Sequence, residues 1–315
     1  MRLCAVSVDL DEIPNYFAIH GLPEPRSPCR TLVYDVAIDR LTRFAHELSI
    51  PLTFFAVGSD LATPAHAAKL RAAVDAGFEI GNHSLDHRYD FVRLGRSEIK
   101  RQIDEGAALI ERATGVAPVG FRAPGYTVRD QVFDVLAELG VTYDSSVFPS
   151  PAYWAAKATA LARIALLRRT SRSILDTPLV LTAPTRPYRV GRPYWRAGHG
   201  VLELPIQVTR RARLPVIGTS LTLWGAVVAR RLARACVGEP LINLELHGID
   251  VLDASDGLEE LRPHQLDVQV AATHKLAALR SAIETIRDAG YAFVTLQSAA
   301  IEIAQSIEIE ADSKM

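Results

Sequence analysis

Cysteine is scarce in the 315-residue sequence. The three cysteines, Cys4, Cys29 and Cys236, lie far apart, and no two of them form a CxxC pair. An odd number of cysteines at such spacings indicates neither a disulfide framework nor a thiolate metal site. We therefore expect buried free thiols.

A surplus of positive charge is also missing from the sequence. Lys and Arg number 35 against 36 Asp and Glu, which gives a formal net charge of -1. Sequence-independent binding to nucleic acid needs a clear excess of basic residues, so we expect no nucleic-acid partner. Any basic patch must be local.

Long apolar runs are the third absence. No stretch of about 18 apolar residues is free of charge, so the sequence predicts no membrane-spanning helix. The first residues run directly into an alternating strand and show neither a long apolar segment nor a cleavage site for a signal peptidase. We expect a cytoplasmic protein.

The sequence does contain short β-branched runs that alternate with longer helical patterns. This alternation predicts an α/β fold, a distorted (β/α) barrel of about seven parallel strands, with its active site at the carboxyl ends of the strands. The expected strands are 3–8, 52–57, 78–81, 119–122, 141–143, 201–205, 241–246 and 292–296. The expected helices are 36–48, 64–76, 97–114, 130–139, 222–235 and 266–289.

One stretch, residues 147–200, interrupts the alternation. It holds nine Lys or Arg, several prolines and a single acidic residue, Asp176. We interpret it as a basic insertion or cap within one catalytic domain that spans residues 1–315. The tail from Ile303 to Met315 reads as a frayed, charged terminus.

Two histidines, His83 and His87, follow the third expected strand at a spacing of four residues. On a helical turn, residues four apart share a face, so both imidazoles could reach one metal ion. Taken alone, such a pair is also compatible with an ordinary surface or core position.

Two carboxylates, Asp9 and Asp11, stand at the carboxyl end of the first strand. If the strand continues that far, both side chains point to the same side. Their negative charges must then be compensated by a cation or an arginine. Two His and one Asp make a ligand set that leaves room for water and substrate, and the second Asp can then act as base. Alternatively, Asp9 and Asp11 could cap a helix or lie exposed to solvent in a loop.

Arg122 and His247 end two further strands. Arg122 stands where a strand turns at Pro-Gly, and its guanidinium could hold Asp9 as a bidentate partner. His247 ends an apolar run, and Glu245 or Asp250 could tune its charge so that it protonates a leaving amine. Alternatively, Arg122 could form a surface ion pair, and His247 could be a core histidine whose hydrogen bonds are satisfied.

Taken in order along the chain, these segments resemble the polysaccharide deacetylase family with the NodB homology domain, also called carbohydrate esterase family four. The resemblance implies a metal-dependent hydrolase that removes an acetyl or formyl group from an amino sugar. It implies that Asp9 is the base, that Asp11, His83 and His87 bind the metal, and that His247 is the acid. It also aligns Arg122-Ala123-Pro124 with the family's Arg-x-Pro motif.

The chain departs from the family pattern at its first motif and after Arg-x-Pro. Leu10 separates Asp9 from Asp11, which leaves the base and ligand assignments interchangeable. Gly125 replaces the aromatic residue after Arg-x-Pro, and Tyr126 follows one step later. In the family, a backbone N–H at this place helps to stabilise the tetrahedral oxyanion, and Gly can still donate it.

The third departure concerns the acid that orients the catalytic histidine in the family. Asp144, Glu203 and Asp250 compete for this role beside His247, and Asp144 is our first choice.

The ligand set favours Zn²⁺, although Co²⁺, Mn²⁺ and Fe²⁺ also accept such ligands. The resemblance extends to the deformylase of the undecaprenyl-linked aminoarabinose pathway, which implies a substrate linked to lipid at the inner face of the membrane. In the insertion, apolar residues near Trp154 could shelter a lipid stem, and Arg168, Arg169 and Arg172 could bind its phosphate. Basic residues of the insertion could also lie at an anionic membrane surface. Alternatively, the same residues could form a lid packed over the barrel, with the arginines exposed to solvent.

Two other functions remain open on the same fold. One is hydrolysis of small cyclic amides or ureides, and the other is binding of a sugar or lipid without catalysis. The sequence leaves the oligomeric state undetermined.

Overall fold

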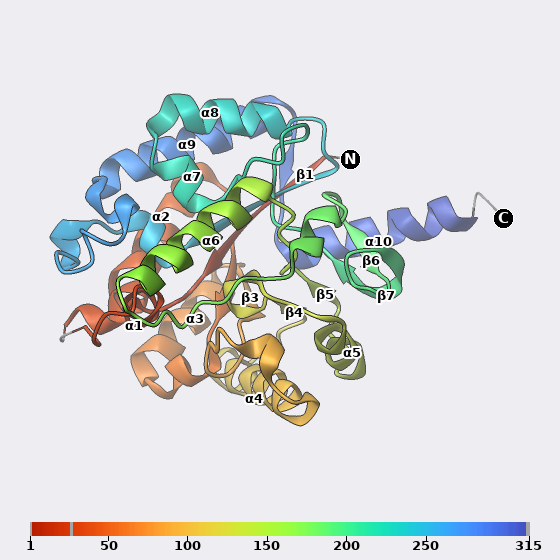
Figure 1. The fold of residues 1–315 in the computed structure, drawn as a ribbon. Coiled ribbons are helices and arrows are strands. Elements are labelled where there is room, and N and C mark those ends of the chain that lie inside the picture. The colour runs from red at the N-terminus through yellow and green to blue at the C-terminus, as the bar shows by residue number, and fades with distance from the viewer. Residues whose placement is uncertain (1, 26–27, 313–315) are drawn as a thin grey trace.

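A curled and mostly parallel sheet occupies the centre of the computed structural model, which describes residues 2–25 and 28–312 (Figure 1). The strand order is β6-β7-β5-β4-β3-β2-β1-β8, and β9 pairs with β1. Only β6 runs antiparallel to its partner. The strands are β1 Leu3–Asp9, β2 Thr53–Ala56, β3 Glu79–Asn82, β4 Gly120–Phe121, β5 Tyr143–Asp144, β6 Tyr188–Val190, β7 Ala197–Glu203, β8 Leu241–His247 and β9 Ala292–Phe293.

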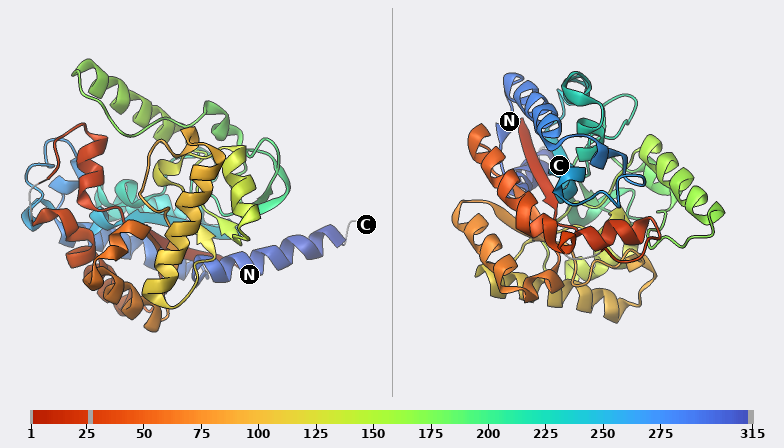
Figure 2. Two further views of the ribbon diagram at one scale, coloured as in Figure 1. Left: turned by 90° about the horizontal axis from the view of Figure 1, so that it is seen from below. Right: turned by 90° about the vertical axis from the view of Figure 1, so that its left-hand side faces the viewer.

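Helices cover the outer face of this sheet, and the left-hand view of Figure 2 shows how α10 extends away from the body. The predicted distorted (β/α) barrel is confirmed. The helices are α1 Ile13–Ile19, α2 Ile38–Leu48, α3 Pro64–Asp75, α4 Arg96–Thr114, α5 Asp130–Glu138, α6 Pro151–Leu166, α7 Gly218–Thr222, α8 Gly225–Cys236, α9 Ala272–Asp288 and α10 Leu296–Asp312.

The barrel is open between β7 and β8, where the described residues form no strand ladder. The segment after β7 bridges the opening instead: the backbone N–H of Gln207 donates to the carbonyl of Asn243 on β8 at 3.2 Å. The side-chain amide of Asn243 donates in return to the carbonyl of Leu204 at 3.0 Å. This irregular closure is what distorts the barrel.

Alternation along β1 decides where the first candidate carboxylate points. All seven residues of β1 are buried, as expected for a parallel strand covered on both faces. Val6 and Val8 pack into the layer under the helices, whereas Ala5 belongs to the cluster inside the barrel. Ser7 and Asp9 follow Ala5 at two-residue steps, so both side chains enter the barrel.

Several expected boundaries are wrong. The helix expected at 222–235 begins at Gly225, because a positive φ of 76° at that glycine separates it from α7. The helix expected at 266–289 begins at Ala272, after a separate 3-10 turn. The tail expected to be frayed is helical up to Asp312 as the end of α10, and its last residues, 313–315, lie outside the described part of the chain. The sequence also missed α1, which follows the first strand directly.

The basic insertion contains one long helix, α6, which lies along the outside of the molecule in both figures. None of its residues is buried. The last helical residue, Leu166, is 84% exposed, and Leu167 after it is 58% exposed. In the described part of the chain, no helix combines the length and hydropathy needed to cross a bilayer.

Gly120 of β4 provides a test of the packing inside the barrel. A Cβ at this position would collide with the ring of Tyr143, whose hydroxyl donates to Glu79 at 2.6 Å. We expect Gly120→Ala to lower the free energy of unfolding by about 1–3 kcal/mol, the usual cost of an overpacked core. Chemical denaturation measures this change.

The matched control is Gly95→Ala, because a methyl group there meets no atom within 4 Å. An equal loss of stability in the two variants would contradict the packing argument.

Candidate metal centre and acid-base pair

The candidate residues from four strand ends meet at one end of the barrel. Asp9 and Asp11 follow from β1, His83 and His87 from β3, Arg122 from β4 and His247 from β8. Parallel strands bring their carboxyl ends to the same edge, so residues far apart in sequence become neighbours. The structure thus brings together the six residues that the sequence selected first.

Asp11, His83 and His87 form the candidate ligand set. The Asp11 Oδ1 atom lies 3.2 Å from His83 Nε2 and 3.0 Å from His87 Nε2. All three side chains are buried, and in the described structure none of these three atoms has a partner in hydrogen-bonding geometry. Unsatisfied buried polar atoms are rare, and a carboxylate facing two imidazole nitrogens suits a divalent cation.

A neighbouring carbonyl orients His83 for this role. Its Nδ1 lies 2.7 Å from the carbonyl of Arg122, so Nδ1 carries the proton and the Nε2 lone pair faces Asp11. Burial raises the pKa of Asp11, but the two imidazoles outweigh burial and hold that pKa well below its usual range. The ligand set therefore suits Zn²⁺, Co²⁺, Mn²⁺ or Fe²⁺.

The helical turn expected for the two histidines is wrong. Residues 83–88 form an irregular loop in which Ser84 and His87 both have positive φ, 69° and 49°. The Asn82 side chain accepts the N–H of Ser84 at 3.0 Å, and Ser84 Oγ accepts the N–H of His87 at 3.2 Å. These two bonds fold the loop so that the imidazoles still converge.

Arg122 is fully buried and holds Asp9 by one hydrogen bond of 2.7 Å rather than by the bidentate pair expected. Its second terminal nitrogen donates to Ser7 Oγ and Ser145 Oγ, both at 2.9 Å, and its Nε donates to the carbonyl of Ser145 at 2.8 Å. The guanidinium also lies over the ring of Phe55. With these partners Arg122 can hold Asp9 in one position.

His247 ends β8 directly beside Asp9, its register partner on β1. Its Nδ1 is 3.0 Å from Glu245 Oε1, and its Nε2 is 3.9 Å from Asp11 Oδ2. Burial lowers the pKa of His247, but Glu245, Asp11 and Asp9 outweigh burial and raise it to about 9. The imidazole is therefore cationic at neutral pH and can donate a proton.

The structure does not bring Asp144 to His247. Asp144 accepts the Oγ–H of Ser146 at 2.8 Å and pairs with Glu203, so it supports the loop after β4. Glu245 occupies the orienting position instead, while Asp250 accepts the backbone N–H of His247 at 2.7 Å. Strand alternation contained the signal, because Glu245 precedes His247 by two residues and shares its face.

The turn after Arg122 approaches the same site. Gly125 and Tyr126 both have positive φ, 63° and 57°, and the Tyr126 hydroxyl lies 3.2 Å from His247 Nε2. Sequence reasoning missed Lys157, which reaches down from α6 and donates to the carbonyl of Gly125 at 2.9 Å. The Lys157 side chain is half-buried, and the partial loss of solvent around its ammonium group lowers its pKa to about 8.

The other residues of the insertion are more dispersed. Trp154 packs into the cluster beside β6 and donates its indole N–H to the carbonyl of Asp176 at 3.0 Å. Arg168, Arg169 and Arg172 line a hollow of about 470 Å³ against α1. Arg172 also lines a second hollow, of about 380 Å³, that contains His87. Among the four residues, Arg172 therefore has the clearest connection to the ligand set.

Comparison with known proteins agrees with the resemblance seen in the sequence. Residues 33–143 match the family profile described as polysaccharide deacetylase, a region that contains His83, His87 and Arg122. The chain is 28% identical to a peptidoglycan deacetylase of Helicobacter pylori over 147 residues, which are 46% of this chain and 49% of that protein. The predicted resemblance to polysaccharide deacetylases is confirmed.

A second relative is a peptidoglycan deacetylase-like protein of Gibberella zeae, 32% identical over 114 residues. This match covers 36% of the chain and 33% of the relative, so the chain spans half or less of the curated relatives it matches. A crystal structure from Mycobacterium smegmatis, assigned as a polysaccharide deacetylase, has the same fold. It superposes with a TM-score of 0.61 at 17% identity, over 97% of this chain and 91% of that one.

The ligand set predicts one divalent ion per chain. We expect His83→Ala and His87→Ala each to abolish most of the bound metal, because each removes one of three ligands from a buried site. Elemental analysis of the purified protein measures the metal content. His199→Ala, at an exposed histidine, is the control and should retain the ion. Unchanged metal content in both site variants would contradict this assignment.

The contact between Glu245 and His247 predicts a shift in titration. Glu245 stabilises the imidazolium, so Glu245→Gln should lower the pKa of His247, and the ring should lose its proton at lower pH than in the wild type. Proton–nitrogen NMR of the imidazole in chelator-treated protein measures this value. An unchanged titration would show that another group controls the charge of His247.

Proposed function

We propose, from the confirmed resemblance to polysaccharide deacetylases, that this protein is a metal-dependent hydrolase that removes an N-acetyl or N-formyl group from an amino sugar. One observation carries the proposal. Asp9 Oδ2 lies 3.8 Å from His83 Nε2, and His247 Nε2 lies 3.9 Å from Asp11 Oδ2. A base and an acid thus border the same cluster, as amide hydrolysis requires.

Each chain residue has a defined task in this reaction. A divalent cation at the ligand set supplies Lewis acidity, which polarises the acyl carbonyl and makes water a stronger acid. Asp9, held by Arg122, removes a proton from the attacking water. His247, held by Glu245, gives its proton to the departing amine as the C–N bond breaks.

The oxyanion that develops on the acyl carbonyl needs a donor as well. We assign this role to the backbone N–H of Gly125, whose carbonyl is fixed by Lys157. We propose Zn²⁺ as the cation first, with Co²⁺, Mn²⁺ and Fe²⁺ as alternatives.

The basic insertion offers residues that could bind part of the substrate. Arg172 lies between a hollow that contains His87 and one that contains Arg168 and Arg169, so an anionic group could bind near the reacting amide. We propose a lipid-phosphate-linked amino sugar as the substrate. Leu166 and Leu167 are exposed beside these arginines, which supports contact with an anionic membrane. We propose that the protein is cytoplasmic and that this membrane surface is the inner face.

The test of this function is a mass-spectrometric screen for loss of acetyl or formyl. The substrates are soluble amino sugars, chito-oligomers, polyprenyl-linked amino sugars and cyclic amides. We expect Asp9→Asn to retain metal but to lose at least about 10²-fold in turnover, the scale of a general base. We expect Arg168→Ala, Arg169→Ala and Arg172→Ala combined to raise KM for lipid-linked substrates only.

Three outcomes would change the assignment. Loss of metal in Asp9→Asn with retention in Asp11→Asn would reverse the two carboxylates. Turnover of cyclic amides alone would overturn the sugar assignment. Sugar binding without any turnover by the metal-loaded protein would identify a binding protein instead of an enzyme.

A further inference from the structure

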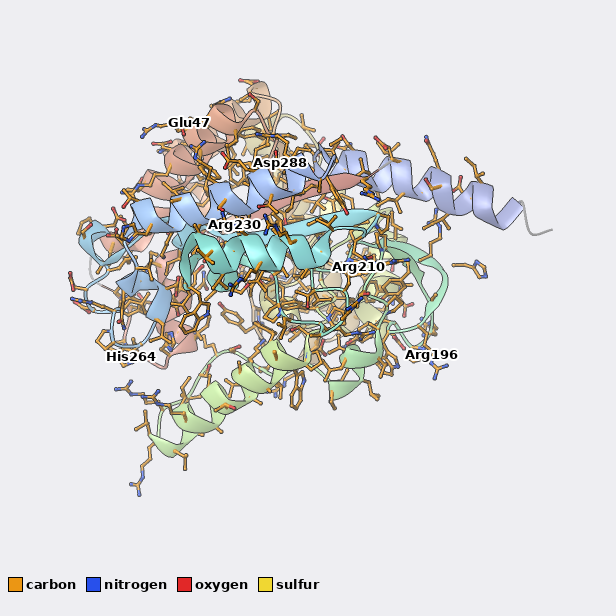
Figure 3. The ribbon with its side chains drawn as sticks, turned by 90° about the horizontal axis from the view of Figure 1, so that it is seen from above. Glu47, Arg196, Arg210, Arg230, His264 and Asp288 are labelled. Atoms are coloured by element: carbon orange, nitrogen blue, oxygen red, sulfur yellow. The ribbon has the colours of Figure 1, made fainter. Side chains whose placement is uncertain are left out.

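A cavity of about 850 Å³ lies far from the candidate metal centre. It is formed by the segment before β6, the segment after β7 and the C-terminal half of α8, and Figure 3 labels Arg210 and Arg230 in this region. Glu239, which lines it, precedes β8, whereas His247 ends β8. The strand rises about 3.3 Å per residue, so the cavity and the acid stand roughly 20 Å apart.

This cavity is strongly basic although the whole chain is not. Five arginines line it against one carboxylate, Glu239. Glu239 already pairs with Arg186 at 2.7 Å and with Arg210 at 3.1 Å. The remaining three arginines, which we call the free triad, are Arg211, Arg231 and Arg234.

The free triad is exposed, and in the described part of the chain its guanidinium groups form no ion pair or hydrogen bond. Arg234 also borders a neighbouring hollow with Glu284 and Asp288 of α9, but neither acid lies within ion-pair distance of it. Like charges gathered without partners repel one another, so the cluster favours a multivalent anion.

One wall of the cavity is apolar. Leu214, Val228 and Leu232 line it, and Leu214 is 43% exposed. Two more apolar side chains are exposed at the start of α8, Val227 at 52% and Trp224, the residue before the helix, at 68%. Exposed large apolar side chains beside cationic groups suit a ligand with both an anionic and an apolar part.

We propose that this cavity is a binding site for a phosphate-bearing ligand, with the free triad holding the phosphate groups and the apolar wall holding the rest. Arginine suits this role because its planar N–H groups bind phosphate oxygens in pairs. The site is independent of the proposed hydrolase activity, since it lies at the other end of β8.

Binding to two probes tests this site and identifies the source of the phosphate. Inorganic pyrophosphate is titrated by calorimetry, and vesicles with phosphatidylglycerol in phosphatidylcholine are tested by co-sedimentation. We expect Arg211→Ala, Arg231→Ala and Arg234→Ala combined to weaken binding at least about tenfold, because each arginine contributes charge-assisted hydrogen bonds. Their exposure predicts an unchanged thermal melt.

The matched control removes three arginines from other faces, Arg43→Ala, Arg93→Ala and Arg112→Ala, which changes the net charge equally. Retained binding in this control supports the site. Binding of pyrophosphate alone indicates a soluble phosphorylated ligand, and binding of vesicles alone indicates a lipid headgroup. Failure of both probes, or equal weakening in the two triple variants, would overturn the proposal.

Discussion

The buried guanidinium of Arg122 is the interaction on which the candidate site depends. A charge with no solvent exposure must be compensated inside the protein, and this one bonds to Asp9, Ser7 and Ser145 while stacking on Phe55. The carbonyl of the same residue orients His83. One side chain and its backbone therefore tie β1, β2, β4, the loop after β3 and the segment after β5 into a single arrangement.

The sequence predicts this arrangement well where geometry is regular. Strand alternation places Asp9 inside the barrel, and parallel strands force the ends of β1, β3, β4 and β8 to one edge. The identities and order of the histidines and Arg122 then indicate a known family. The strand cores were predicted correctly because their apolar runs are short, continuous and bounded by turns.

The sequence does not predict the irregular loops or the contacts between side chains of different elements. The loop that joins His83 to His87 depends on left-handed residues and two side-chain bonds, which no periodicity reveals. The motif comparison favours Asp144 over Glu245 because it ranks residue types, whereas the ion-pair partner of His247 depends on which strand faces meet. The arginines of the free triad come from two segments that meet only in the fold, so their concentration is invisible along the chain.

The exposure of α6 has an energetic consequence for the barrel beneath it. None of its residues is fully buried, but Trp154 packs against the cluster beside β6, and Lys157 donates to the carbonyl of Gly125. Elements with little buried surface unfold locally at a smaller free-energy cost than the whole protein. Any movement of α6 that withdraws Lys157 would release the carbonyl of Gly125. The stability of this exposed helix and the geometry of the proposed oxyanion donor are therefore coupled through one hydrogen bond.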